Sequence, residues 1–203
     1  MSQRLSFVVV TLLATAAIAL ALFWHPQMPP ATGAKPPSGG DFVLAADTGP
    51  VDTRSLRGKV VLVLFGYTYC PDICPTSLTT IGHALAKLTP TETDQVTVLF
   101  VSVDPERDTP ARLKDYVQFF HPGIVGLTGS TEDIAKAAKL YGAIYARHDV
   151  PNGGYVIDHS AWTYVLAPNG RMVARFEHGI SAEQLAGEIR NWLPASPPSK
   201  GSS

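Results

Sequence analysis

Two apolar runs rich in β-branched residues constrain the fold of this chain more than any other feature. They are Val60–Phe65 (VVLVLF) and Val96–Val103 (VTVLFVSV). A strand with one face in water alternates apolar and polar residues, whereas a nearly unbroken apolar run is typical of a strand buried on both faces. Because other elements must then cover both faces, the two runs predict the interior strands of a sheet packed between helices.

Helix signals alternate with these strands. Apolar residues recur at helical spacing between Pro75 and Leu88, and Thr109-Pro110 places a capping residue before a proline in the first turn. Ser130-x-x-Asp133 and Ser181-x-x-Gln184 are typical of helix starts. The sequence therefore predicts helices at 75–88, from 110 onward, at 130–141 and at 181–192.

Turn signals predict two hairpins. Phe42–Ala45 and Val51–Thr53 flank an Asp-Thr-Gly-Pro turn, and Trp162–Leu166 and Met172–Phe176 flank Pro168-Asn169-Gly170. The order of elements is thus β-α-β-α, then a hairpin and a last helix. It predicts an α/β fold with a central mixed sheet flanked by helices and an N-terminal β-hairpin.

The N-terminal stretch 5–24, LSFVVVTLLATAAIALALFW, contains no charged residue. Twenty residues in a helix span about 30 Å, the thickness of a membrane's hydrocarbon core. Arg4 precedes the stretch and no Lys or Arg follows it until Lys35, so the positive-inside rule exports the rest of the chain. We interpret residues 1–24 as a single-span anchor in a bacterial inner membrane with the domain in the periplasm. A cleaved signal sequence with a site at Ala19-Leu20-Ala21 is the alternative.

One folded domain is expected between two polar segments. Residues 25–40 are rich in proline and glycine and are expected to form a linker, and residues 194–203 are expected to form a disordered tail. The domain would then occupy residues 41–193. Sixteen Lys and Arg face seventeen Asp and Glu without a basic block, which argues against nucleic acid as a partner.

The only two cysteines of the chain, Cys70 and Cys74, follow the first buried strand within GYTYCPDICPTS. In α/β sheets, chemistry gathers at the carboxyl ends of strands, and a helix N-terminus stabilises a thiolate. If residues 70–74 start a helix, the two sulfurs lie one turn apart on one face, with Cα atoms about 6 Å apart. That geometry allows either a disulfide or a shared metal ion. The spacing therefore leaves thiol–disulfide exchange and metal binding open.

Metal binding requires a further ligand. Structural zinc prefers four Cys and His ligands, whereas Cu(I) prefers thiolates and accepts fewer ligands, so two Cys and one His would suit copper. Five histidines are expected at the surface or in the linker: His25, His83, His121, His148 and His178. His159 differs because it stands just before the predicted strand 162–166, where the chain re-enters the sheet. The residues alone leave its role open.

Three blocks of the sequence resemble the Sco/SenC family, copper proteins with a thioredoxin fold that act in cytochrome c oxidase assembly. They are GYTYCPDICPT from Gly66, VSVDPERDTP from Val101, and VIDHS from Val156. The resemblance covers residues 41–193 and the N-terminal anchor. It implies a thioredoxin-like fold and a copper site formed by Cys70, Cys74 and His159, which holds Cu(I), with Cu(II) as a further state.

Charged residues near these blocks are candidates for supporting roles. Asp72 lies between the cysteines and Asp104 ends the second buried strand, so either is expected to orient the metal ligands. Glu106, Arg107 and Asp108 are expected on a solvated face or a face that docks a partner.

The resemblance implies a membrane-tethered periplasmic copper metallochaperone rather than an enzyme. It would deliver copper to the CuA site in the copper-bearing subunit of cytochrome c oxidase. Its other expected partners are a periplasmic thiol reductant and another periplasmic copper chaperone. The alternative is a thiol–disulfide oxidoreductase that uses Cys70 and Cys74 to keep the oxidase subunit's cysteines reduced, and a thiol peroxidase is a third reading. If the protein acts by binding metal, its activity should depend on Cys70, Cys74 and His159. If it acts by thiol–disulfide exchange, its activity should depend on the two cysteines only.

Overall fold

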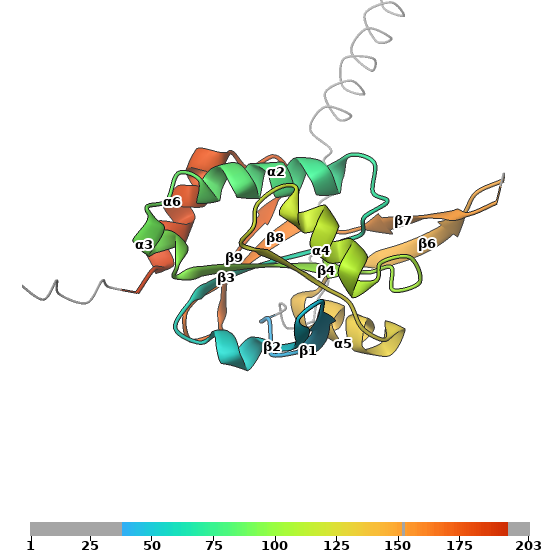
Figure 1. The fold of residues 1–203 in the computed structure, drawn as a ribbon, viewed down its shortest axis with the longest axis horizontal. Coiled ribbons are helices and arrows are strands. Elements are labelled where there is room, and N and C mark those ends of the chain that lie inside the picture. The colour runs from blue at the N-terminus through green and yellow to red at the C-terminus, as the bar shows by residue number, and fades with distance from the viewer. Residues whose placement is uncertain (1–37, 152, 195–203) are drawn as a thin grey trace, which may run out of the picture. The chain divides into compact units, whose positions relative to one another are not determined.

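The computed structural model of this chain describes residues 38–151 and 153–194 (Figure 1). The expected anchor at 1–24, most of the expected linker and residues 195–203 of the expected tail lie outside the described residues. Within the described ranges, no helix combines the length and the apolar character needed to cross a membrane.

A five-stranded mixed sheet in the order β5-β4-β3-β8-β9 occupies the centre. Its strands are β3 (Val60–Gly66), β4 (Val96–Ser102), β5 (Ile124–Leu127), β8 (Trp162–Leu166) and β9 (Met172–Glu177). The two apolar runs form the neighbouring parallel strands β3 and β4, and β8 pairs with β3 in the antiparallel direction. Every residue of β3 is buried, which accounts for its unbroken apolar sequence.

Helices cover both faces of this sheet (Figure 1). Val60, Leu62 and Leu64 of β3 pack in the same core cluster as α2 (Ile73–Leu85), α4 (Pro110–Gln118) and α6 (Ala182–Trp192). The alternate residues Val61, Val63 and Phe65 pack with α5 (Thr131–Tyr141) and the N-terminal hairpin. That hairpin comprises β1 (Val43–Ala46) and β2 (Gly49–Asp52). The predicted α/β fold with a mixed sheet and an N-terminal hairpin is confirmed.

Local capping signals place three helices correctly. The hydroxyl groups of Thr109, Ser130 and Ser181 each accept a hydrogen bond from the backbone N–H three residues later, at the starts of α4, α5 and α6. Helix α2 spans 73–85 rather than the expected 75–88. Two short helices, η1 (Thr53–Leu56) and α3 (Pro90–Thr93), complete the set in the described part of the chain.

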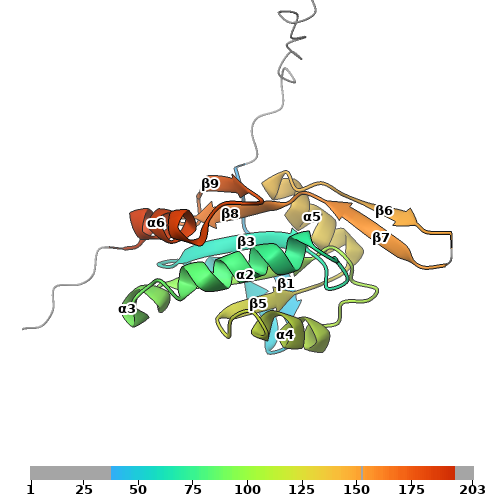
Figure 2. The same ribbon diagram turned by 90° about the horizontal axis from the view of Figure 1, so that it is seen from above.

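A third hairpin, separate from the two that were predicted, was not expected from the sequence. It consists of β6 (Tyr145–Asp149) and β7 (Tyr155–His159), and Figure 2 shows it extending beyond the end of the central sheet. Ile157 is the only buried residue of these two strands. The segment therefore lacks the apolar pattern that predicts strands. His159 is the last residue of β7, and His148, expected at the surface, is exposed and lies in β6.

Candidate metal centre

Cys70 and Cys74 lie where β3 leads into α2, at the carboxyl end of the central strand. Helix α2 begins at Ile73, and Asp72 before it has the non-helical angles φ −140° and ψ −65°. Only Cys74 is therefore helical, and the expectation that both cysteines share one helical turn is wrong. Pro71 gives the reason, because a residue before proline is disfavoured in the helical region. Cys70 instead lies in the turn that precedes the helix.

His159 completes a group of three side chains that could hold a metal ion. The two sulfurs and a ring nitrogen of His159 all lie within 4.8 Å of one another. Nε2 of His159 is 3.3 Å from Sγ of Cys74, and Nδ1 is 3.2 Å from the carbonyl oxygen of Ser160. A hydrogen bond from Nδ1 to that carbonyl leaves Nε2 facing the sulfurs, which is how ligating histidines are usually oriented. The Tyr67 ring packs edge-on against the imidazole at 5.8 Å.

The three side chains differ in their access to solvent. Cys74 is fully buried, at 0% exposure, whereas Cys70 and His159 are half-buried. Cys70 and His159 line an open cleft of about 520 Å³, whose walls include Tyr67, Ile73 and Val156. A metal ion held here would rest on a buried sulfur and face the cleft on its other side.

Comparison with known proteins identifies the family of this chain. Residues 30–194 match the family model described as SCO1/SenC. The chain belongs to the SCO1/SenC family. It is 40% identical over 156 residues to the SCO2-like protein RP587 of Rickettsia prowazekii, which covers 75% of this chain and 76% of that protein. The resemblance deduced from the three sequence blocks is confirmed.

Two solved structures show what similar SCO1/SenC chains contain. Bradyrhizobium japonicum ScoI with copper bound is 40% identical, with a TM-score of 0.71 over 76% of this chain and 99% of that one. BsSco is 26% identical, with a TM-score of 0.60 over 79% of this chain and 96% of that one. It is described as having a disulfide switch and as a member of the Sco family of cytochrome c oxidase assembly proteins.

The two cysteine thiols of this SCO1/SenC chain have very different pKa values. A hydrogen bond from the Cys74 thiol, with support from His159 and the N–H groups of Cys74 and Asp72, lowers the pKa of Cys70 to about 3. The same hydrogen bond and burial raise the pKa of Cys74. Burial opposes the charged form of His159, but hydrogen bonds to Cys70 and to the Ser160 carbonyl raise its pKa overall. Cys70 is therefore the thiolate, and a metal ion must displace a proton to bind Cys74.

Gly66 at the end of β3 makes room for the buried sulfur. A Cβ at this position would lie 2.4 Å from Sγ of Cys74 and 2.8 Å from Cε2 of Phe100. We expect Gly66→Ala to lower the free energy of unfolding by about 1–3 kcal/mol and to weaken metal binding, because Cys74 must move. Denaturant unfolding and copper competition measure both effects. Gly187→Ala is the control, since a Cβ there meets no atom within 4 Å; unchanged stability of Gly66→Ala would contradict the argument.

The carboxylates of Asp72 and Asp104, which were expected to orient the metal ligands, form hydrogen bonds with other residues in this SCO1/SenC chain. The Asp72 carboxylate accepts a hydrogen bond from the Thr76 hydroxyl, and it is the backbone N–H of Asp72 that points to Cys70. Asp104 is buried and accepts hydrogen bonds from Nε of Arg107 and from the hydroxyl of Tyr155. In the described structure, neither carboxylate is hydrogen-bonded to Cys70, Cys74 or His159.

Asp108 was expected on a solvated face but is fully buried, at 0% exposure. Its carboxylate accepts hydrogen bonds from the N–H and hydroxyl of Thr68, at 2.9 and 2.6 Å, and from the hydroxyl of Ser102 at 2.6 Å. It therefore ties the loop that precedes Cys70 to the end of β4. The sequence did not indicate this burial, because Asp108 follows the charged residues Glu106 and Arg107 and a run of charged residues is usually solvated.

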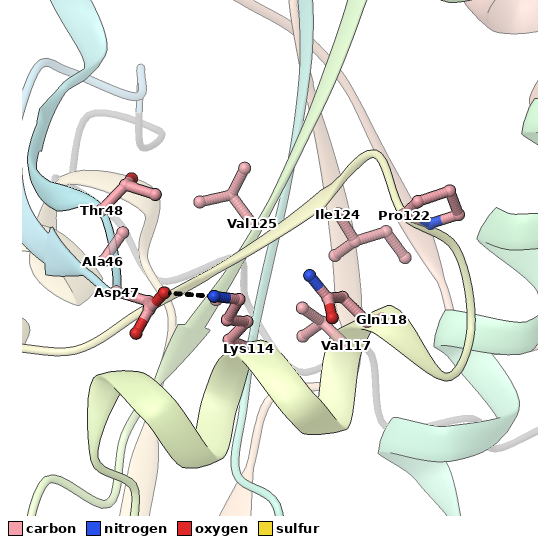
Figure 3. Close-up of a pocket in the computed structure, with 10 residues that line it drawn as sticks. Ala46, Asp47, Thr48, Lys114, Val117, Gln118, Pro122, Ile124 and Val125 are labelled. Carbon is pink, nitrogen blue, oxygen red and sulfur yellow. Dashed lines mark hydrogen bonds and ion pairs between the residues drawn. The ribbon is translucent and has the colours of Figure 1, made fainter.

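A second cavity, of about 190 Å³, lies between the N-terminal hairpin, α4 and β5 (Figure 3). Its walls include Val117, Ile124 and Val125, and Nζ of Lys114 reaches the Asp47 carboxylate at 2.6 Å. Its one carboxylate is paired with a lysine, and its lining contains neither cysteine nor histidine. It therefore does not compete with the Cys70–Cys74–His159 group as a metal site.

Proposed function

We propose that this chain is a copper metallochaperone of cytochrome c oxidase assembly, which binds one copper ion through Cys70, Cys74 and His159. The observation that carries the proposal is the convergence of two sulfurs and one imidazole nitrogen within 4.8 Å. Two thiolates and an imidazole suit Cu(I), and Cu(II) is a further state of the same ligand set. The copper-bound ScoI, 40% identical to this chain, supports copper as the metal.

The recipient of the copper would be the CuA site in the copper-bearing subunit of cytochrome c oxidase. The half-open cleft suits transfer, because a ligand from a partner protein can approach the ion from the cleft side. The description of BsSco as a member of a family of cytochrome c oxidase assembly proteins supports this recipient.

The proposed site of action is the periplasm, with the chain anchored in the inner membrane through residues 1–24. The uncharged stretch 5–24 and the absence of Lys and Arg between Arg4 and Lys35 support this arrangement. That compartment oxidises thiols, so the pair would need a periplasmic thiol reductant before copper loading, with another periplasmic copper chaperone as the donor.

Titration with Cu(I) in competition with a chelator tests the proposal on the reduced protein. We expect one copper ion per chain. Loss of a residue that only supports a metal ligand typically costs roughly 10–100-fold in affinity, and we expect His159→Ala, which removes a ligand, to cost more. His148→Ala is the matched control, because His148 lies on the same hairpin and is exposed and paired with Asp158. Equal affinity of His159→Ala and the parent would remove His159 from the site.

The second candidate function is thiol–disulfide exchange, which the inequality of the two cysteines favours. The half-buried Cys70 thiolate would attack a partner's disulfide and form a mixed disulfide. Cys74 would then lose its proton and displace the partner, which leaves with both its thiols reduced while Cys70 and Cys74 become a disulfide. This activity needs both cysteines but not His159. Reduction of a disulfide-bonded peptide by His159→Ala at the parental rate, with parental copper affinity, would favour this function over the first.

A further inference from the structure

A stack of alternating arginine and tyrosine side chains connects the hairpin that carries His159 to the loop that carries Cys70. We call it the Arg–Tyr stack, and its members in order are Arg147, Tyr155, Arg107, Tyr69 and Arg112. Cζ of Arg147 and Cζ of Arg107 lie 3.6 and 3.7 Å from the Tyr155 ring centroid. Cζ of Arg107 and Cζ of Arg112 lie 4.5 and 4.4 Å from the Tyr69 ring centroid. Guanidinium groups at these distances are attracted to the ring faces.

The members of the Arg–Tyr stack come from five different segments. Arg147 and Tyr155 belong to β6 and β7, Arg107 to the loop after β4, Tyr69 to the loop after β3, and Arg112 to α4. Tyr69 is the immediate neighbour of Cys70, and Tyr155 lies in the same strand as His159. The stack therefore spans the gap between the two parts of the chain that contribute metal ligands.

Arg107 is the central member and also the most firmly held. Its Nη1 donates a hydrogen bond to the backbone carbonyl oxygen of Tyr155 at 3.0 Å, and its Nε donates to the Asp104 carboxylate. The Tyr155 hydroxyl donates to the same carboxylate at 2.6 Å. Asp104 is only 2% exposed, so a buried anion holds both side chains in place.

The β6–β7 hairpin has few other contacts with the rest of the domain. Arg147 pairs with the exposed Glu106 at 3.0 Å, and Tyr145 packs partly buried against the core. Ile157 is the only buried residue of the two strands, and its N–H donates to the Tyr67 hydroxyl at 3.3 Å. Ser160 fixes the base of the hairpin through hydrogen bonds with the backbone of Ile144. Tyr155 lies toward the tip, about 13 Å along the strand from His159. The Arg107–Tyr155 contact therefore fixes β7 at the end opposite its base, and Figure 2 shows how far the hairpin extends from the sheet.

We propose that Arg107 is a positioning residue for the metal site, which fixes the direction of β7 through the Arg–Tyr stack and thereby the orientation of His159 toward the two sulfurs. Asp104 supports the site through Arg107 and Tyr155 rather than through the ligands. Without Arg107 the far end of β7 would be free to move about the base at Ser160, and the His159 ring beside that base would no longer be held in one orientation toward the sulfurs. The proposal rests on the proposed copper site.

Copper affinity in a double-mutant cycle tests the proposal on the reduced full-length protein. The four proteins are the parent, Arg107→Gln, His159→Ala and the double variant. We expect Arg107→Gln to weaken Cu(I) binding by about 10-fold or more in the parent. In the His159→Ala background the same substitution should change affinity by less than about 2-fold, because the group that it positions is absent.

The cycle separates a positioning role from a general loss of structure. An equal effect of Arg107→Gln in both backgrounds, or no effect in the parent, would overturn the proposal. Arg175→Gln is the matched control, since Arg175 stacks on Trp162 at 3.9 Å outside the Arg–Tyr stack; it should bind copper like the parent. If His159→Ala itself bound copper like the parent, the proposed function would fail whatever Arg107 does.

Hydrogen exchange of the metal-free protein provides a readout that does not depend on copper. We expect Arg107→Gln to speed exchange of the amides of β6 and β7 by about 10-fold or more and to leave those of β3 and β4 unchanged. Tyr155→Phe is the second variant if Arg107→Gln folds poorly. It removes only the hydrogen bonds of the Tyr155 hydroxyl and should produce a smaller change at the same amides. Hairpin amides that exchange at the parental rate in both variants would overturn the proposal.

Discussion

Replacement of either cysteine by serine is expected to abolish tight copper binding. A serine hydroxyl is a hard, neutral oxygen, whereas Cu(I) prefers thiolates, so either variant leaves one sulfur and one imidazole. We expect an affinity loss larger than that of His159→Ala, measured in the same Cu(I) chelator competition. Because Cys70 lies in a turn and is half-buried, Cys70→Ser should retain the parental fold.

The two serine variants also differ in a way that checks the assignment. Cys74→Ser places a hydroxyl at a fully buried position beside Gly66 and Phe100, so it should lower the free energy of unfolding as well. Cys70→Ser should lose copper with little change in denaturant stability. Parental copper affinity in a folded Cys70→Ser protein would exclude Cys70 as a ligand.

Oxidation of Cys70 and Cys74 to a disulfide is expected to reduce copper uptake from one ion per chain to none. The same two sulfurs would serve both purposes, because they are free in this structure and both belong to the proposed ligand group. Formation of the disulfide from the Cys70 thiolate and the Cys74 thiol gives two electrons to the oxidant and releases one proton, and neither sulfur is then a thiolate. Metal analysis of oxidised and reduced protein measures the stoichiometry.

Two controls complete this experiment. A phosphine reductant, which adds no competing thiol, should restore copper uptake to the oxidised protein. Copper loading before exposure to oxidant should slow disulfide formation, detected by mass after alkylation of free thiols. Stoichiometric copper in the fully oxidised protein would place the metal site elsewhere in the chain.

The sheet and most helices could be predicted because their causes are local or follow from burial. β3 is buried on both faces, and this appears directly as VVLVLF in the sequence. Ser130 and Ser181 cap helices through hydrogen bonds to amides only three residues away, so short sequence patterns suffice.

The β6–β7 hairpin could not be predicted because contacts distant in sequence hold it. Its strands YARHD and YVIDH are mostly exposed, and Arg107 and Tyr67, which bind it, lie about fifty and ninety residues away in sequence. The turn at Cys70 was missed for a local reason, since Pro71 delays the start of the helix until Ile73.

The metal group itself was only partly accessible to sequence reasoning. The cysteine pair and its place after a buried strand are visible in the sequence, but His159 is separated from Cys74 by 85 residues. Only the family resemblance connected them. Asp108 was misplaced for a different reason: its carboxylate is fully buried, but it stands within a run of charged residues, which is a pattern typical of the surface.

The burial of Cys74 would give the proposed copper transfer an order of events. A donor atom from a recipient protein would approach from the cleft, where Cys70 and His159 are accessible. Those two proposed ligands would be exchanged first, while the Cys74 sulfur beside Gly66 still held the ion. The ion would then pass through a state shared by both proteins without release into solvent. Cys74 would be the last ligand to dissociate, so its departure, rather than the first encounter, would complete the transfer.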